Sequence, residues 1–173
     1  MKFTLRFQMK SQMLEKKTQK IRRIPYGASD FESIQLGNDY YIDKTSFIEK
    51  LELTRFVFLI RPRRFGKSLL LSVLNTYYDI NKKDRFEEFY QNTHILKNPT
   101  EERGKYMILY FNFSAILKDI DKIQENFNNY CVKIINRFIV DYEKYLPKRL
   151  VELIEKEKTA HEKLQLLSTE LKD

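Results

Sequence analysis

Cysteine is almost absent from this 173-residue sequence, and no apolar run approaches the length of a membrane span, which is about 18 residues. One thiol, Cys131, cannot build a disulfide framework within the chain, so a reducing cytoplasm is the expected setting. Its place in a helical pattern predicts a buried packing residue. Basic residues interrupt the first ten positions, so no secretory leader is expected, and the protein is predicted to be soluble.

Histidine is also scarce. His94 and His161 have no partners at the spacing of metal ligands, so they predict no metal site of their own. The sequence is 42% hydrophobic, which is enough to bury one core. A chain of this length and composition is expected to form one domain or part of one.

Acidic residues are nearly missing from the first 28 positions. Eight basic residues face Glu15 alone there, which gives this segment a net charge of +7, whereas the remainder holds 24 basic and 23 acidic residues. A basic arm on a near-neutral body does not make the charged stripe of a DNA-binding face. The arm is expected to be a solvated tail, with loose phosphate binding as the open alternative.

Residues 61–68 carry the strongest functional signal. Gly66, Lys67 and Ser68 match the last three positions of the phosphate-loop motif G-x-x-x-x-G-K-[ST], and Arg61 stands where the motif begins with glycine. In such a loop, main-chain amides surround a phosphate at the positive end of the following helix. The lysine adds a charge between the terminal phosphates, and the small hydroxyl reaches the magnesium ion.

The residues expected to bind nucleotide follow from these roles. The amides of Arg64 and Phe65 would form the cradle with Gly66, which lets the backbone approach the phosphate closely. Lys67 would contact the β- and γ-phosphates, and Ser68 would ligate Mg²⁺. The expected cofactors are therefore ATP and Mg²⁺.

The flanks of the loop predict the elements that a phosphate loop joins. Residues 56–60, with the sequence FVFLI, form an uninterrupted apolar run typical of a strand buried on both faces of a parallel sheet. After the loop, apolar residues from Leu69 to Tyr77 recur at helical spacing. The alternative interpretation is a basic surface turn before an ordinary amphipathic helix.

Four motifs follow one another between Ile24 and Ser114. They are Pro25-Tyr26-Gly27 with Asp30-Phe31-Glu32, then Tyr41-Ile42-Asp43-Lys44-Thr45, then Arg61 to Ser68, and then Phe111-Asn112-Phe113-Ser114. In these motifs the sequence resembles the bacterial AAA-ATPase-like family, which writes its own loop as R-P-R-R-F-G-K-S, so Arg61 agrees with the family. The family usually has aspartate in place of Asn112, which puts an acidic role there in doubt. Large members often carry a PD-(D/E)xK nuclease-like domain downstream.

The expected fold class is α/β: the N-terminal part of a P-loop NTPase three-layer αβα fold, with an incomplete parallel sheet and a helix-rich C-terminal half. Residues 1–24 are expected to be a flexible basic arm. Residues 25–173 are expected to be a partial AAA-ATPase-like P-loop domain, truncated before the Walker B strand. We therefore expect ATP binding without hydrolysis by this chain alone, and self-association or a partner protein to cover unpaired strand edges.

The other segments are predicted from apolar spacing and punctuation. A second buried strand is expected at residues 106–111, and a short aromatic helix near Phe86. A long helix is expected to run to Tyr142, which makes residues 138–143, the nearest candidate for a Walker B strand, helical instead. Two further helices are expected at residues 148–158 and 162–171, the second opened by a capping box at Thr159 and Glu162.

Three assignments stay open at this point. Asp43, Lys44 and Thr45 either lie near the nucleotide, as the resemblance implies, or cap a helix that runs to about residue 53. The side chains of Arg63 and Arg64 contact phosphate, contact a neighbouring element, or face solvent. The chain as a whole has two alternative functions: a nucleic-acid-associated module that uses the basic arm, or a degenerate remnant without catalysis.

Overall fold

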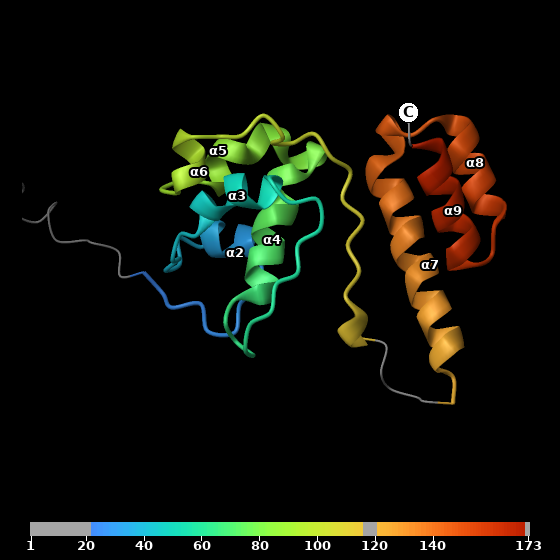
Figure 1. The fold of residues 1–173 in the computed structure, drawn as a ribbon, viewed down its shortest axis with the longest axis horizontal. Coiled ribbons are helices and arrows are strands. Elements are labelled where there is room, and N and C mark those ends of the chain that lie inside the picture. The colour runs from blue at the N-terminus through green and yellow to red at the C-terminus, as the bar shows by residue number, and fades with distance from the viewer. Residues whose placement is uncertain (1–21, 116–120, 172–173) are drawn as a thin grey trace, which may run out of the picture. The chain divides into compact units, whose positions relative to one another are not determined.

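A computed structural model describes residues 22–115 and 121–171. By its contacts the chain divides into two compact units. Unit 1 comprises the described residues up to Leu74 together with residues 87–99, and unit 2 comprises residues 75–86 with the described residues from Thr100 onward. Figure 1 shows the helices that make up each unit.

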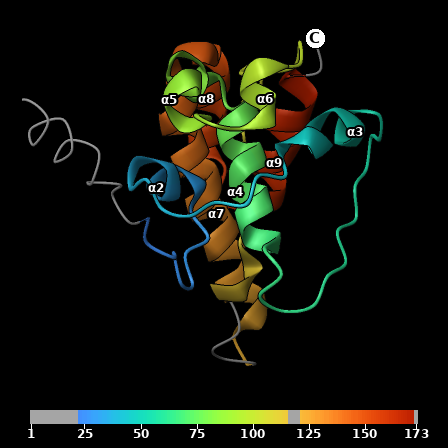
Figure 2. The ribbon, with the colours of Figure 1, turned by 90° about the vertical axis from the view of Figure 1, so that its left-hand side faces the viewer.

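Unit 1 is built from short helices around the first part of one longer helix. The helices are α2 (Phe31–Leu36), a 3₁₀ turn (Thr45–Phe47), α3 (Ile48–Glu52), the start of α4 (Lys67–Tyr78), most of α5 (Phe86–Phe89) and α6 (His94–Lys97). The helix expected near residue 86 and the helical segment after Asp43 are therefore confirmed. The connection from α3 to α4 stands away from the helices of this unit (Figure 2).

Aromatic packing joins α2 to α4 in unit 1. The ring of Phe31 is fully buried, with its centroid 5.3 Å from that of Tyr41 and 4.9 Å from that of Tyr90. The Tyr90 hydroxyl donates to the carbonyl of Val73 at 2.6 Å. The amide of Phe31 donates to the Ser72 hydroxyl at 2.9 Å. The beginning of α2 is thus bonded to the second turn of α4.

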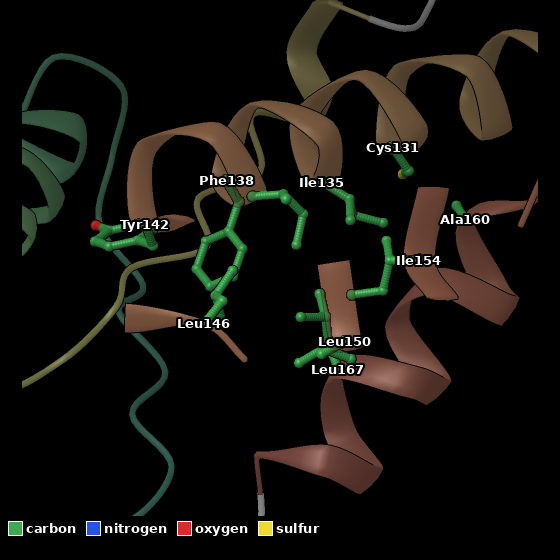
Figure 3. Packing of buried hydrophobic residues seen from close by; sticks show 10 residues of the cluster. Cys131, Ile135, Phe138, Tyr142, Leu146, Leu150, Ile154, Ala160 and Leu167 are labelled. Atoms are coloured by element: carbon green, nitrogen blue, oxygen red, sulfur yellow. The ribbon is translucent and has the colours of Figure 1, made fainter. Parts of the chain in front are cut away.

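Unit 2 is a helical bundle. Its helices are α7 (Ile123–Tyr142), α8 (Lys148–Lys156) and α9 (Ala160–Glu170), with 3₁₀ turns at Ile80–Arg85 and Glu143–Tyr145. Figure 3 shows Ile135, Ile154 and Leu150 directed into the space between the helices. Cys131 is buried in the same cluster, so its predicted packing role is confirmed, and burial raises the pKa of its thiol. The predicted helices of the C-terminal half are confirmed, including residues 138–142 within α7.

The predicted α/β fold is wrong for the described residues. Within residues 22–115 and 121–171 there is no β-strand, and hence no sheet of a three-layer αβα P-loop fold. Residues 56–60, expected to be a buried strand, are irregular, and Phe58 and Ile60 are 91% and 93% exposed. An apolar run becomes a buried strand only when neighbouring strands bond its amides and other layers cover its faces. In the described structure, no neighbouring strand pairs with residues 56–60 and no layer of helices covers them.

The prediction of a second strand at residues 106–111 is also wrong. Its contact with Asp79 is an isolated parallel bridge at Tyr106. Further along, Ile108 donates its amide to the Tyr142 hydroxyl at 3.0 Å, and Asn112 donates to the Tyr130 hydroxyl at 2.7 Å. The hydroxyl groups of two tyrosines of α7 therefore accept hydrogen bonds from main-chain amides, which in a sheet would donate to a neighbouring strand. Apolar side chains of this segment pack on the core of unit 2 instead of within a sheet.

The predicted capping box at the start of α9 is confirmed. Thr159 accepts from the amide of Glu162 at 3.3 Å, and the Glu162 carboxylate accepts from the Thr159 amide at 3.1 Å. The hydrogen bonds from Thr159 lower the pKa of Glu162 below its ordinary value. These bonds satisfy two amides that would have no partner within the helix.

We predict that Thr159→Ala lowers the free energy of unfolding by about 1 kcal/mol, because it removes the acceptor for the Glu162 amide. Urea denaturation followed by circular dichroism measures the change. Thr169→Ala is the matched control, since Thr169 donates within the same helix to the Gln165 carbonyl and alanine is the better helix former. Equal losses for the two variants would contradict the role of the cap.

Candidate functional site

The loop expected to bind phosphate leads directly into a helix. Helix α4 begins at Lys67, and the Gly66 carbonyl accepts the Leu70 amide at 2.9 Å. Both Arg64 and Gly66 have left-handed backbone conformations, with φ of 65° and 76°. A Cβ on Gly66 would meet no atom within 4 Å, so the backbone conformation, and not crowding, favours glycine there. Arg64 adopts the same region with a side chain, at a cost of about 1–2 kcal/mol.

The ammonium of Lys67 folds back onto its own loop. Its Nζ donates to the carbonyl of Arg61 at 2.5 Å and to that of Pro62 at 2.8 Å. The side chain is half-buried, whereas the loop from Arg61 to Gly66 is exposed. The charge is thus paired with neutral carbonyls, which are weaker acceptors than a phosphate oxygen.

A cavity of about 530 Å³ lies between this loop and the segment that precedes α2. One wall is formed by residues 24–29, where Gly27 has φ of 74°. The other wall comprises Arg64, Gly66, Lys67, Ser68 and Leu69. Four of the five residues predicted to bind nucleotide therefore line one cavity. The fifth, Phe65, lines a second cavity of about 430 Å³ together with Arg64 and Gly66.

In the motif Asp43-Lys44-Thr45, the two outer residues bond main-chain amides and the middle residue lines a cavity. Asp43 accepts from the Thr45 amide at 2.8 Å and from the His94 amide at 2.7 Å. The hydroxyl of Thr45 accepts from the Ile95 amide at 3.1 Å. Asp43 and Thr45 therefore hold the N-terminus of α6, which favours the structural interpretation for these two residues. Lys44, between them, is exposed and lines the second cavity.

The ion pair between Arg23 and Asp39 was not anticipated from the sequence, which assigned Arg23 to the flexible arm. Its Nε and Nη2 each donate to one carboxylate oxygen of Asp39 at 3.0 Å. The carbonyl of Arg23 accepts the Tyr40 amide at 2.8 Å. Arg23 is exposed and the Asp39 side chain is buried. No local sequence pattern indicates this pair, because its partners are 16 residues apart.

The remaining candidates lie away from this loop in sequence or outside the description. Asn112 accepts from the amide and hydroxyl of Ser114, so it forms a local turn in unit 2. In the parts of the chain that the structure describes, no three histidine, cysteine or acidic side chains group as metal ligands. None of the helices described there is long and apolar enough to cross a bilayer. Residues 1–21 of the basic arm lie outside the described residues, so their predicted binding to nucleic acid stays a prediction.

Comparison with known proteins adds a family and one relative. A family model described as "Predicted AAA-ATPase", of the AAA-ATPase-like family, matches residues 25–171. The "Uncharacterized protein in vnfD 5'region" of Azotobacter chroococcum mcd 1 is 47% identical over 55 residues, which are 31% of this chain. The match spans 11% of the length of that relative. No solved structure matches the chain.

We predict that Asp43→Ala lowers the free energy of unfolding by about 1–2 kcal/mol, because it removes the acceptor for two amides. At a temperature where the variant stays folded, its affinity for a nucleotide is expected to equal that of the unsubstituted protein. Thermal denaturation and a fluorescent ATP analogue measure the two quantities. Glu49→Ala, on the exposed face of α3, is the control and should change stability by less than about 0.5 kcal/mol. A loss of affinity in a folded Asp43→Ala would refute the purely structural role.

Proposed function

This chain belongs to the AAA-ATPase-like family, and from that premise we propose that it binds ATP with Mg²⁺ through Arg64, Phe65, Gly66, Lys67 and Ser68. The observation that carries the proposal is the turn itself. A left-handed glycine ends an exposed loop at the first residue of α4, beside a cavity that Lys67 and Ser68 line. A site that meets phosphate with main-chain amides requires this combination of glycine, helix start and open space.

The proposed roles follow from the chemistry of each group. The amides of Arg64, Phe65 and Gly66 donate to phosphate oxygens, and the positive end of α4 favours the negative charge of the ligand. Helix α4 has 12 residues, so its terminal amides form part of a sustained helix. Lys67 supplies the full positive charge at the terminal phosphates.

Binding of ATP would exchange the partners of Lys67. In the described structure its ammonium is held by the Arg61 and Pro62 carbonyls. A triphosphate offers charged oxygens, which add to each hydrogen bond the Coulomb attraction between opposite full charges that the neutral carbonyls lack. The ammonium would therefore leave the loop carbonyls for the phosphate, which frees the loop to close on the ligand.

The residues present also fit a nucleotide-bound magnesium ion. Ser68 follows Lys67 in α4, is exposed and lines the cavity, so its hydroxyl oxygen lies beside the space for the terminal phosphates. Mg²⁺ is commonly bound by one or two protein groups together with substrate phosphates. When bound there, the ion would neutralise charge on the phosphate oxygens.

The proposal is nucleotide binding, and it assigns no carboxylate to hydrolysis. Asp141, the first of the two acidic residues in the candidate Walker B segment, lies in α7, where it accepts from Arg137 Nε at 2.9 Å. It is thus engaged on a helix and does not end an apolar strand.

Lys67→Ala is expected to weaken binding of ATP at least about tenfold, because a charge-assisted hydrogen bond contributes about 1.5–3 kcal/mol. Isothermal titration calorimetry with a non-hydrolysable ATP analogue measures the affinity. Lys97→Ala is the control, since Lys97 is an exposed lysine of the same unit on α6 and leaves the cavity unchanged. Unaltered affinity in Lys67→Ala would remove the site assignment.

Ser68→Ala is expected to reduce the gain in ATP affinity that Mg²⁺ produces, because the hydroxyl is the one protein ligand proposed for the ion. Titrations with Mg²⁺ and with excess chelator give this gain for each protein. Ser46→Ala, an exposed serine in the 3₁₀ turn of unit 1, serves as the control. An identical gain in Ser68→Ala and the unsubstituted protein would exclude Ser68 as a ligand.

A further inference from the structure

A third cavity of unit 1 lies apart from the phosphate loop. It has a volume of about 380 Å³ and shares no lining residue with the cavity beside Lys67. One wall is the end of α2 with the turn that follows it, and the other is the second half of α5 with its following turn. The first wall comprises Gln35, Leu36, Asn38, Asp39 and Tyr41, the second comprises Glu88, Gln91 and Asn92, and Arg22 completes the lining.

Carboxamide groups make up much of the polar lining of this third cavity. The side chains of Gln35, Asn38, Gln91 and Asn92 each present a carbonyl oxygen and N–H donors, the same kinds of group that a peptide main chain presents. Within residues 22–115 and 121–171, none of these four side chains has a hydrogen-bond partner. They are therefore available to a ligand that offers both donors and acceptors along its length, as an extended peptide does.

The backbone that carries these side chains is held by local bonds. Asn38 and Asn92 have left-handed conformations, with φ of 51° and 61°, a region that asparagine adopts more readily than most residues. The Asn38 amide donates to the Gln35 carbonyl at 3.0 Å. The amide and the hydroxyl of Thr93 both donate to the Tyr90 carbonyl, at 3.2 and 2.7 Å. Both turns are thus formed in the absence of a ligand, which lowers the entropic cost of binding one.

The described chain begins on the lining of the third cavity. Arg22 is the first described residue and lines the cavity, and the next residue, Arg23, is bonded to Asp39 on the first wall. Because an extended chain advances by at most about 3.6 Å per residue, residues 16–21 stay within about 20 Å of Arg22. A segment tethered so closely meets its site at an effective concentration on the order of millimolar. Residues 16–21 are therefore favoured over any free peptide as the occupant.

The charge of the segment complements that of the second wall. Glu88 lines the cavity and is exposed, and Glu87 precedes it in the first turn of α5. Residues 16–21, with the sequence KKTQKI, hold three lysines and no acidic residue. Leu36, 54% exposed, adds apolar surface on the first wall, on which the aliphatic part of a lysine side chain can pack.

We propose that residues 16–21 bind in the third cavity as an extended peptide. The carboxamides of both walls bond its main chain, and Glu88 pairs with one of its lysines. This inference is independent of the proposed function, because residues 64–68 do not line this cavity. It gives the last part of the basic arm a binding site on unit 1 of the same chain, and it leaves residues 1–15 outside the contact.

Limited digestion of the full chain with trypsin tests the contact, because the protease cleaves after lysine and needs an accessible segment. Mass spectrometry gives the rate at each lysine, and a synthetic peptide of residues 1–24 gives the rates for an unbound arm. We expect cleavage after Lys16 and Lys17 to be at least about tenfold slower in the full chain than in the peptide, since the rate follows the unbound fraction. Cleavage after Lys10 should be similar in both. Equal rates at Lys16 and Lys17 in chain and peptide would overturn the proposal.

Substitutions on the second wall separate binding from mere proximity to the folded unit. Glu88→Gln removes a charge and Gln91→Ala removes a carboxamide, and each is expected to speed cleavage after Lys16 and Lys17 about threefold. Glu87→Gln is the matched control, because Glu87 is the preceding exposed residue of α5 and does not line the cavity. Unchanged protection in both wall variants would refute the cavity as the binding site.

Two further readouts exclude other causes of protection. Cleavage after Lys97, an exposed residue of α6, is expected to stay constant in the wall variants. A parallel rise at Lys97 would attribute the faster cleavage to unfolding of unit 1 and would count against the assignment. Protection of Lys16 and Lys17 is expected to be independent of protein concentration. Protection that grows with concentration would show that the arm of a second copy fills the cavity, and would overturn binding within one chain.

Discussion

The hydrogen bond from the Phe31 amide to the Ser72 hydroxyl is the contact on which the geometry of the site depends. Residues 24–29, which form one wall of the cavity, lie just before Phe31, and Ser68 lies one helical turn before Ser72. This bond thus helps to set the distance between the wall and the loop. The Phe31 ring is buried against Tyr90, whose hydroxyl donates to the Val73 carbonyl, so α2 is also held to α4 next to this bond. Packing in the core of unit 1 therefore also helps to fix the positions of the cavity wall and of the phosphate loop.

The loop itself combines a rigid end with an adaptable one. At Gly66 the left-handed backbone passes into α4, where regular helical bonding restrains the chain. From Arg61 to Arg64 the chain is exposed, and the contacts described for it come chiefly from its own Lys67. A ligand that takes the ammonium would release the exposed part while the helical part stays fixed. Such a division suits a site whose amides must be preorganised and whose entrance must move.

The sequence predicted those features that local patterns determine. The spacing of apolar residues identified α7, the Thr159 and Glu162 pair identified the start of α9, and the Gly66-Lys67 step identified the start of α4. In each case the interacting residues are close in sequence, so a local pattern contains the information.

Features that depend on distant partners were not predictable in the same way. The run at residues 56–60 has the composition of a buried strand, but composition does not reveal which neighbours would pair with it, and in the described structure it is exposed. At residues 106–111, tyrosines of α7 supply hydroxyl acceptors for main-chain amides, an arrangement that apolar periodicity does not encode. The Arg23–Asp39 pair and the bond from the His94 amide to Asp43 join residues 16 and 51 positions apart. Only the folded chain brings them together.

The Asp43-Lys44-Thr45 motif shows how structural and binding roles can share three consecutive residues. Asp43 and Thr45 each accept an amide from the first turn of α6, so the backbone on both sides of Lys44 is fixed to that helix. Because Asp43 and Thr45 are fixed to α6, the position of Lys44 between them is fixed as well. Lys44 lines the second cavity, which Arg64 also lines. Lys44 does not line the cavity beside Lys67 and Ser68, so its charge can act on the proposed phosphate site only from a distance. The two outer side chains act on α6, and a location of the motif near a nucleotide, which the family resemblance implies, stays a prediction.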